Sequence, residues 1–213
     1  MTARHLLTHT HGMVDYLRID TAANDTTDDA LATFFEEDFG SLGYLMAPAG
    51  RFWNYSNPGY MLAGLLVEKA SGQSYRSYMR EHVWAPLGMN RTFLLAEDVL
   101  ADGDFAYGAT LHWSNGQPTI AGPESYDNGW ARPAGYAWSS VIDMAELVKL
   151  WRAGDEAVIT NASRHEMISS QVDTEELADI VHYGFGVQRY EGVFVGDSFY
   201  DMSSLTHGGA IKG

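Results

Sequence analysis

The clearest hydrophobic pattern in the chain lies between residues 57 and 72, where apolar side chains recur at the spacing of one helix face. These positions are Tyr60, Leu62, Leu65, Leu66 and Ala70. Pro58 suits the first turn of a helix, and Gly72 suits the residue that follows its last turn. The segment is therefore predicted to be an amphipathic helix with a defined start and end.

Four more segments carry a helical pattern: residues 2–10, 28–37, 74–84 and 139–154. The first has Leu6 and Leu7 as its apolar face. The last begins with a serine and an aspartate and stops at a glycine, which are typical helix boundary signals. Residues 20–30 are polar and are predicted to be mainly a loop.

The pattern changes in the second half of the chain. Residues 101–135 are rich in Gly, Pro, Asn and aromatic side chains, which predicts an irregular, partly extended region. Residues 182–192 and 204–213 are predicted to be strands. We expect one partial α+β domain over residues 1–213, mainly helical and loop to about 180, with returning sheet strands over 181–213. A strand ending at residue 213 would leave an unpaired edge, so we expect a chain truncated at both ends.

Composition restricts the partners. The 213 residues carry a net charge of -15, which disfavours binding to nucleic acid or to an anionic membrane. The absence of cysteine excludes disulfides and thiolate catalysis. No stretch approaches the roughly 18 apolar residues of a membrane span, and residues 1–13 lack the apolar region of a signal peptide. We expect a soluble protein whose compartment the sequence leaves open.

A candidate site precedes the helix at 57–72, where Tyr55, Ser56 and Asn57 are adjacent. A tyrosine hydroxyl serves as a general base only if positive charge lowers its pKa from about 10. A serine or asparagine before a helix is, by default, an N-cap. Taken alone, these three residues are better explained as a helix cap.

A second candidate site is the glycine-rich stretch His207, Gly208, Gly209 and Ala210. Glycines on a strand allow a ligand or another backbone to approach closely, and a backbone N–H group there could bind an oxyanion. A bulge or tight bend explains the same residues, and on this stretch alone it is the favoured explanation.

A third candidate site is formed by His5, His9 and His11, whose spacings occur in zinc sites. No acidic residue follows at the short spacing that metallohydrolases use, since Asp15 comes four positions after His11. We therefore expect no metal site, and we expect no cofactor.

Taken together and in order, four blocks resemble the serine β-lactamase-like family. The family includes class C β-lactamases, penicillin-binding carboxypeptidases, D-aminopeptidases and related esterases. The blocks are "TARHLLTHTHGM", "FWNYSNPGYMLAGLLVEKASGQSY", "ARPAGYAWSSVIDMAELVKL" and the pair "YGFGV" with "HGGAIKG". In the first block His11 stands where the family has a serine. The resemblance implies the β-lactamase/penicillin-binding-protein-like fold.

The resemblance also implies roles for particular residues. Tyr55 would be a proton-transfer group beside the nucleophile, and Asn57 would hold a substrate amide or a lysine. His207, Gly208 and Gly209 would lie on the strand lining the other side of the cleft. The backbone N–H of Ala210 would form half of the oxyanion hole. Ser56 receives no catalytic role, and the substrate would be a small amide or ester, with His207 in place of lysine favouring esterases and peptidases over β-lactamases.

The family's nucleophile, the serine of a Ser-x-x-Lys motif, is absent. The chain's lysines are Lys69, Lys149 and Lys212, and none has a serine three positions earlier. We expect the motif to lie upstream, in a complementary segment of the same protein, and we expect weak or no turnover from this chain. Two alternatives stay open: a non-catalytic binding or regulatory protein of the same fold, and a metal-dependent hydrolase using the three histidines.

Overall fold

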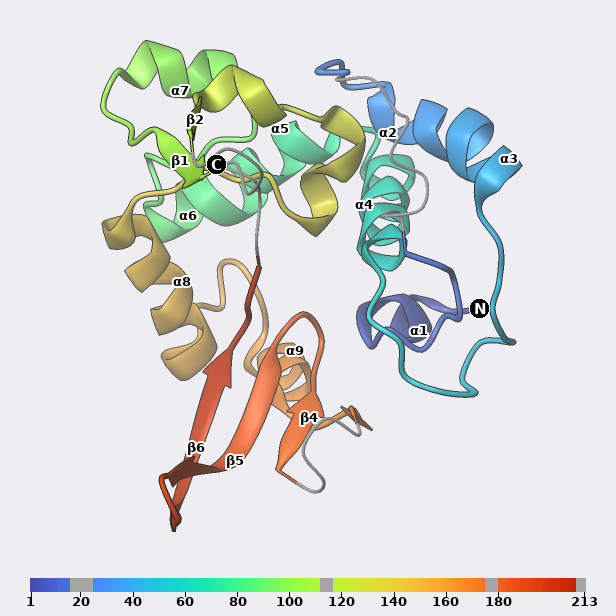
Figure 1. Cartoon of the computed structure of the whole chain (residues 1–213), viewed down its shortest axis with the longest axis vertical. Coiled ribbons are helices and arrows are strands. Elements are labelled where there is room, and N and C mark those ends of the chain that lie inside the picture. Colours follow the sequence, from blue (N-terminus) through green and yellow to red (C-terminus); the bar gives the residue numbers. More distant parts are fainter. Residues whose placement is uncertain (16–24, 112–116, 175–179, 210–213) are drawn as a thin grey trace.

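The computed structural model describes residues 1–15, 25–111, 117–174 and 180–209. Helices form most of the molecule, and an antiparallel sheet extends away from them (Figure 1). The predicted α+β class is confirmed. None of the helices in the described ranges is both long enough and apolar enough to cross a bilayer.

The first helix, α1 (Ala3–Leu7), is shorter than the predicted 2–10. Its start is fixed by a reciprocal cap, because the Thr2 hydroxyl accepts the His5 N–H and the His5 ring accepts the Thr2 N–H. The chain then leaves the helix and carries residues 8–15 towards the start of α4 (Asn57–Ser71), as the Ser56 hydrogen bond to Val14 shows.

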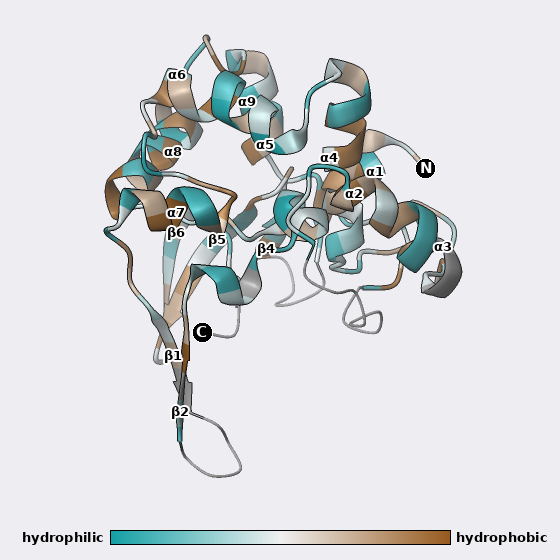
Figure 2. Ribbon diagram, turned by 90° about the horizontal axis from the view of Figure 1, so that it is seen from above, coloured by the Kyte–Doolittle hydropathy of each residue, from teal (hydrophilic) through white to brown (hydrophobic). Residues whose placement is uncertain are grey.

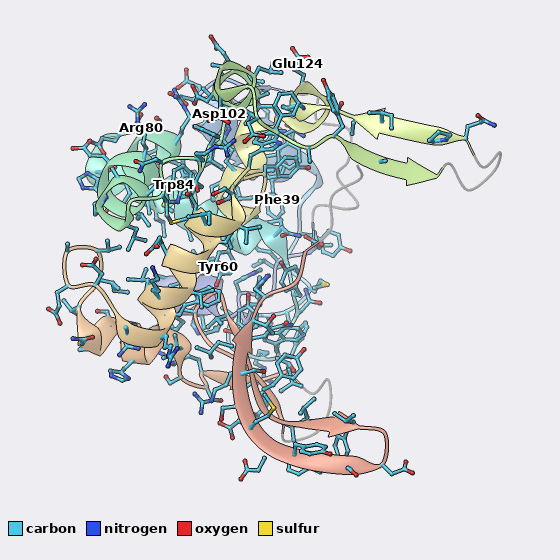
Figure 3. The ribbon with its side chains drawn as sticks, turned by 90° about the vertical axis from the view of Figure 1, so that its left-hand side faces the viewer. Phe39, Tyr60, Arg80, Trp84, Asp102 and Glu124 are labelled. Carbon is cyan, nitrogen blue, oxygen red and sulfur yellow. The ribbon has the colours of Figure 1, made fainter. Side chains whose placement is uncertain are left out.

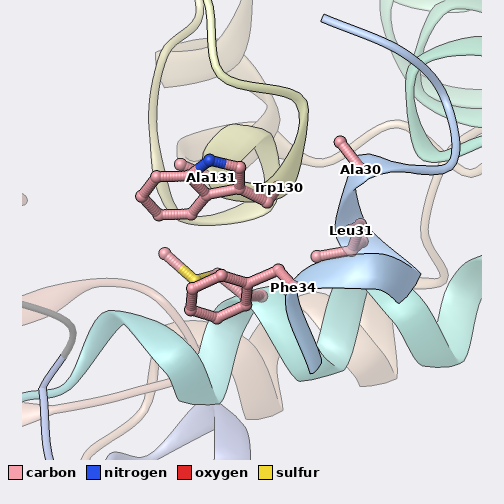
Figure 4. Close-up of a cluster of buried hydrophobic side chains, with 6 residues drawn as sticks. Ala30, Leu31, Phe34, Trp130 and Ala131 are labelled. Carbon is pink, nitrogen blue, oxygen red and sulfur yellow. The ribbon is translucent and has the colours of Figure 1, made fainter. Parts of the chain in front are cut away.

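The helix predicted at 28–37 runs further, through α2 (Ala30–Thr33), the π-helical segment η2 (Phe34–Asp38) and α3 (Phe39–Leu42). Its buried side joins a core cluster shown in Figure 4, in which Phe34 stacks on Trp130 with ring centroids 4.9 Å apart and planes 10° apart. The cluster consists of Ala30, Leu31, Phe34, Met61, Trp130 and Ala131. Burial of these large side chains fixes the helix against the centre of the molecule.

Helix α4 (Asn57–Ser71) confirms the strongest sequence prediction, and Gly72 ends it in the left-handed conformation with φ of 71°. The predicted apolar stripe is only partly covered, because Leu65 packs against the core cluster whereas Leu66 is 47% exposed. The buried face instead consists of Pro58, Gly59, Met61 and Gly64. A Cβ atom at Gly64 would lie 2.2 Å from Pro133 Cγ, so the missing side chain is what allows this close contact.

A second helical layer follows α4. It consists of α5 (Tyr75–Met79), η3 (Arg80–Trp84) and α6 (Ala85–Leu87), which together match the helix predicted at 74–84. Trp84, Met89 and Leu94 form its core cluster. Helix α7 (Ala96–Asp102), which the sequence did not predict, comes next.

The region predicted to be irregular contains a short hairpin of β1 (Gly108–Leu111) and β2 (Pro118–Ala121). This hairpin projects from the body of the molecule in Figure 2. Two 3₁₀ helices follow, η4 (Pro123–Tyr126) and η5 (Gly129–Ala134), and η5 packs against α4.

Helix α8 (Val141–Ala153) matches the prediction, whereas α9 (Asn161–Ile168) was not predicted. The antiparallel sheet has the order β3-β4-β5-β6. Its strands are β3 (Val172–Asp173), β4 (Val181–Tyr183), β5 (Gln188–Val195) and β6 (Ser198–Thr206). The strand predicted at 204–213 is therefore wrong in its bounds. Thr206 pairs with Gln188, where β5 begins, so residues 207–209 lie beyond the end of their partner strand.

The β5–β6 arm and one side of α8 carry exposed apolar side chains. Phe194 is 61% exposed on β5, and Val141 is 86% exposed at the start of α8. Further exposed members are Val195, Phe199, Tyr200, Met202 and Ile142. Strand β6 is the last strand of the described sheet, so the exposed side chains on β6 lie at an open sheet edge.

Candidate active site

A cavity of about 540 Å³ is lined by residues of the helical part of the molecule and by residues of the sheet. Two of its lining residues, Tyr60 and Trp84, are labelled in Figure 3. Its polar end is formed by residues that are far apart in sequence: His9, Tyr55, Asn57, Tyr183 and His207. The two residues predicted to act at the start of α4 and the histidine predicted on the opposite side thus line one cavity.

Tyr55 lies at the entrance to this polar end and is 38% exposed. Its ring centroid is 4.3 Å from that of His9 and 6.1 Å from that of His207. Burial raises the pKa of Tyr55, and the negative charge of Asp15 raises it further. In this chain the Tyr55 hydroxyl is therefore a neutral phenol that can donate a hydrogen bond.

Asn57, the first residue of α4, is held by Asp15. Its backbone N–H donates to Asp15 Oδ1 at 3.0 Å, and its side-chain Nδ2 donates to the same oxygen at 3.3 Å. Because a carboxylate only accepts hydrogen bonds, the amide nitrogen faces Asp15 and the amide oxygen is directed away from it. Asp15 fixes which end of the amide is offered as an acceptor. No sequence signal identified this role across a separation of 42 residues.

His9 is buried beneath this site, with 1% of its surface exposed. Its Nδ1 accepts the Ser56 N–H at 3.2 Å, and its Nε2 lies 3.2 Å from the Tyr183 hydroxyl oxygen. Burial, with smaller contributions from nearby His11 and His207, lowers its pKa to about 3. The imidazole is therefore neutral. The Tyr183 hydroxyl in turn lies 2.9 Å from His207 Nε2.

Backbone strain is concentrated at this cavity. His9 has φ of 55° and Tyr136 has φ of 63°, and among the described residues these are the non-glycine residues with positive φ. Both line the cavity. This left-handed conformation costs about 1–2 kcal/mol for a side chain with a Cβ, and such strain is typical of functional sites.

The glycine-rich stretch is placed differently from the prediction. His207, Gly208 and Gly209 come directly after β6 and are not part of a strand, because β5 offers no partner beyond Gln188. Ala210 lies outside the described residues. The oxyanion role of this stretch stays a prediction. Ser56 is fully buried, and its hydroxyl donates to the Val14 carbonyl at 3.3 Å, away from the cavity.

The histidines near the N-terminus have other partners than a metal ion. The Nδ1 atoms of His9 and His11 accept the backbone N–H groups of Ser56 and Met13, and His5 Nδ1 caps α1. Within the described ranges, no group of three or more His, Cys, Asp or Glu side chains is arranged to hold a metal ion.

A comparison with protein families identifies the family of the chain. The family model described as Beta-lactamase matches residues 1–213. Penicillin-binding protein 4* of Bacillus subtilis is 37% identical over 97 residues, which are 43% of this chain and 21% of that protein. Beta-lactamase-like protein 2 of Dictyostelium discoideum is 29% identical over 126 residues, 59% of this chain and 22% of that protein. The chain thus spans about a fifth of the length of these two relatives.

Solved structures share the fold. The octameric penicillin-binding protein homologue from Pyrococcus abyssi superposes with a TM-score of 0.73 at 28% identity, covering 89% of this chain and 43% of that one. A D-stereospecific amidohydrolase from Streptomyces sp. superposes with a TM-score of 0.70 at 20% identity, covering 100% of this chain and 62% of that one. The second likeness is evidence of the fold alone.

Proposed function

Because the chain belongs to the serine β-lactamase-like family, we propose that it forms one part of a serine hydrolase active site whose nucleophile comes from a segment outside this chain. The observation that carries this proposal is the meeting of Tyr55, Asn57 and His207 at the polar end of one cavity. The chain contains no Ser-x-x-Lys sequence. A complementary segment of the same protein would supply it.

The proposed reaction is acyl transfer. The serine oxygen attacks the carbonyl carbon of an amide or ester, and the serine proton passes to Tyr55 in its ionised form. The bond to the leaving group breaks, the leaving group takes up the proton, and water then attacks the acyl-enzyme. The amide oxygen of Asn57 is directed away from Asp15. It would accept a hydrogen bond from an N–H group of the substrate or of the lysine.

The lysine of the absent motif matters because of the state of Tyr55. Its pKa is raised by burial and by Asp15, whereas a proton acceptor needs a lowered pKa. A lysine ammonium beside the phenol would favour the phenolate by Coulomb attraction. Without that charge Tyr55 stays protonated, so this chain alone is proposed to turn over weakly or not at all.

The substrate class follows from the neighbours and from His207. The similar proteins above 25% identity include penicillin-binding proteins. We propose β-lactams, D-amino-acid peptides or small esters as substrates. His207 stands where strict β-lactamases carry a lysine, which favours the peptidase and esterase reactions.

The test is intact mass spectrometry after incubation with a fluorophosphonate probe. We expect no adduct on this chain, and an adduct on one of its own serines, such as Ser139, would contradict the external nucleophile. Adding an N-terminal segment that carries the family's Ser-x-x-Lys motif should produce one adduct, on the added serine. In that fusion, Tyr55→Phe should slow labelling by roughly 10²-fold or more, while the control Tyr190→Phe should not. A fusion that never labels would favour a non-catalytic binding protein of the same fold.

A further inference from the structure

His207 is joined to the interior of the molecule by a hydrogen-bonded chain that neither the family match nor the proposed reaction uses. The chain runs from the Ser56 N–H to His9, from His9 to Tyr183, and from Tyr183 to His207. The three contacts measure 3.2, 3.2 and 2.9 Å. It connects a fully buried backbone group with an exposed side chain at the cavity.

The direction of each hydrogen bond in this chain can be derived. The Ser56 N–H can only donate, so His9 Nδ1 must accept and carries no hydrogen. Since the buried His9 ring is neutral, its one hydrogen lies on Nε2 and is donated to the Tyr183 oxygen. The opposite direction would place a second donor hydrogen on Nδ1, against the Ser56 N–H.

The remaining step concerns the Tyr183 hydroxyl hydrogen. Tyr183 accepts from His9, so its own hydrogen is available for His207 Nε2 at 2.9 Å. Neighbouring Tyr60 donates its hydroxyl hydrogen to the Leu7 carbonyl at 2.6 Å, so towards Tyr183 it can only accept. It competes with His207 Nε2 for the Tyr183 hydrogen, and we assign that hydrogen to the 2.9 Å contact with His207. A neutral His207 that accepts at Nε2 must carry its hydrogen on Nδ1.

We propose that His9 and Tyr183 are positioning residues that hold neutral His207 in the Nδ1–H tautomer, so that His207 presents an N–H donor to an acceptor oxygen of the substrate. Free imidazole side chains prefer the opposite, Nε2–H tautomer, so the network selects the less common form. The fitting substrate group is a carboxylate or carbonyl oxygen on the side of the cavity opposite Asn57. Only this last statement rests on the proposed function, because the tautomer is a property of the chain without substrate.

The test is long-range ¹H–¹⁵N NMR of the whole chain labelled with ¹⁵N-histidine, recorded where imidazoles are neutral. The signals of His207 are assigned by their loss in His207→Gln. We expect its Nε2 to show the downfield shift of an unprotonated nitrogen, and Tyr183→Phe to move the population mostly to the Nε2–H form. The control Tyr190→Phe, on the neighbouring strand β5, should change nothing.

A second pair of variants tests His9. His9→Gln keeps an acceptor for Ser56 and a donor for Tyr183, so the Nδ1–H tautomer of His207 should be retained. His9→Ala removes both groups, so the Nε2–H tautomer of His207 should become populated. An Nε2–H tautomer in the unchanged chain would overturn the proposal, and so would a tautomer unaffected by Tyr183→Phe. If the His207 tautomer is unchanged in His9→Ala, the proposed positioning role of His9 is wrong. None of these readings uses catalysis, so a failure here is distinct from a failure of the proposed function.

Discussion

Gly64 in the middle of α4 allows a prediction whose sign depends on packing. Helix propensity alone predicts that Gly64→Ala stabilises the protein by about 1 kcal/mol. The structure predicts the opposite, because the new Cβ would lie 2.2 Å from Pro133 Cγ and 2.5 Å from Pro133 Cβ. Ordinary contact begins at 3.4 Å, so α4 and η5 would have to separate by about 1.2 Å.

The size of the loss follows from the rigidity of Pro133. Its ring cannot rotate away, and η5 is fixed by the Trp130 stack on Phe34 and by the buried ion pair of Arg132. The upper part of the range for overpacking, about 3 kcal/mol, therefore applies. After the gain in helix propensity, we expect a net loss of about 2 kcal/mol.

Urea unfolding followed by far-UV circular dichroism measures this difference. The control is Ala70→Gly at the exposed end of the same helix, which should cost about 0.5–1 kcal/mol and calibrates the propensity term. A Gly64→Ala protein that is more stable by about 1 kcal/mol would show that α4 and η5 are not in tight contact.

Two further predictions concern buried ionisable groups. Asp127→Ala should lower stability by about 3–5 kcal/mol, because it leaves the buried Arg132 without its 2.9 Å partner; a loss below about 1 kcal/mol in urea unfolding would contradict this. Stability should also fall as pH drops from 6.5 towards about 3, because the unfolded chain takes up a proton that buried His9 does not. The His9 share reaches about 1.4 kcal/mol per pH unit and should disappear in His9→Gln, so an unchanged slope in that variant would refute it.

The sequence predicted elements well where the signals are local. Pro58 and Gly72 mark the two ends of α4, and both act through their own backbone conformation. The fully buried face of the same helix was not identified, because it includes Gly59 and Gly64. Glycines carry no apolar side chain and so do not contribute to a hydrophobic pattern, although they permit the closest packing. Helix α9 was missed because it is polar along most of its length, and α7 because Leu95 at its N-cap makes no side-chain hydrogen bond.

The candidate site could be predicted only in its motif residues. Tyr55, Asn57 and His207 were expected to meet, and they line one cavity. Their partners were not identified, because Asp15 lies 42 residues from Asn57 and Tyr183 lies 174 residues from His9. Contacts between residues so far apart leave no repeating pattern in the sequence, because they form only when the chain has folded.

The β5–β6 arm has a consequence for the protein at high concentration. Its open edge offers backbone hydrogen-bonding groups beside exposed Phe194 and Tyr200, a combination that favours pairing with a second copy. The net charge of -15 opposes such pairing, because identical chains repel one another. Salt shortens the range of that repulsion to about 10 Å at 0.1 M while leaving the apolar attraction intact. The colloidal behaviour of the chain should therefore be governed by ionic strength: monomers predominate in dilute buffer, and association through the sheet edge increases as salt is added.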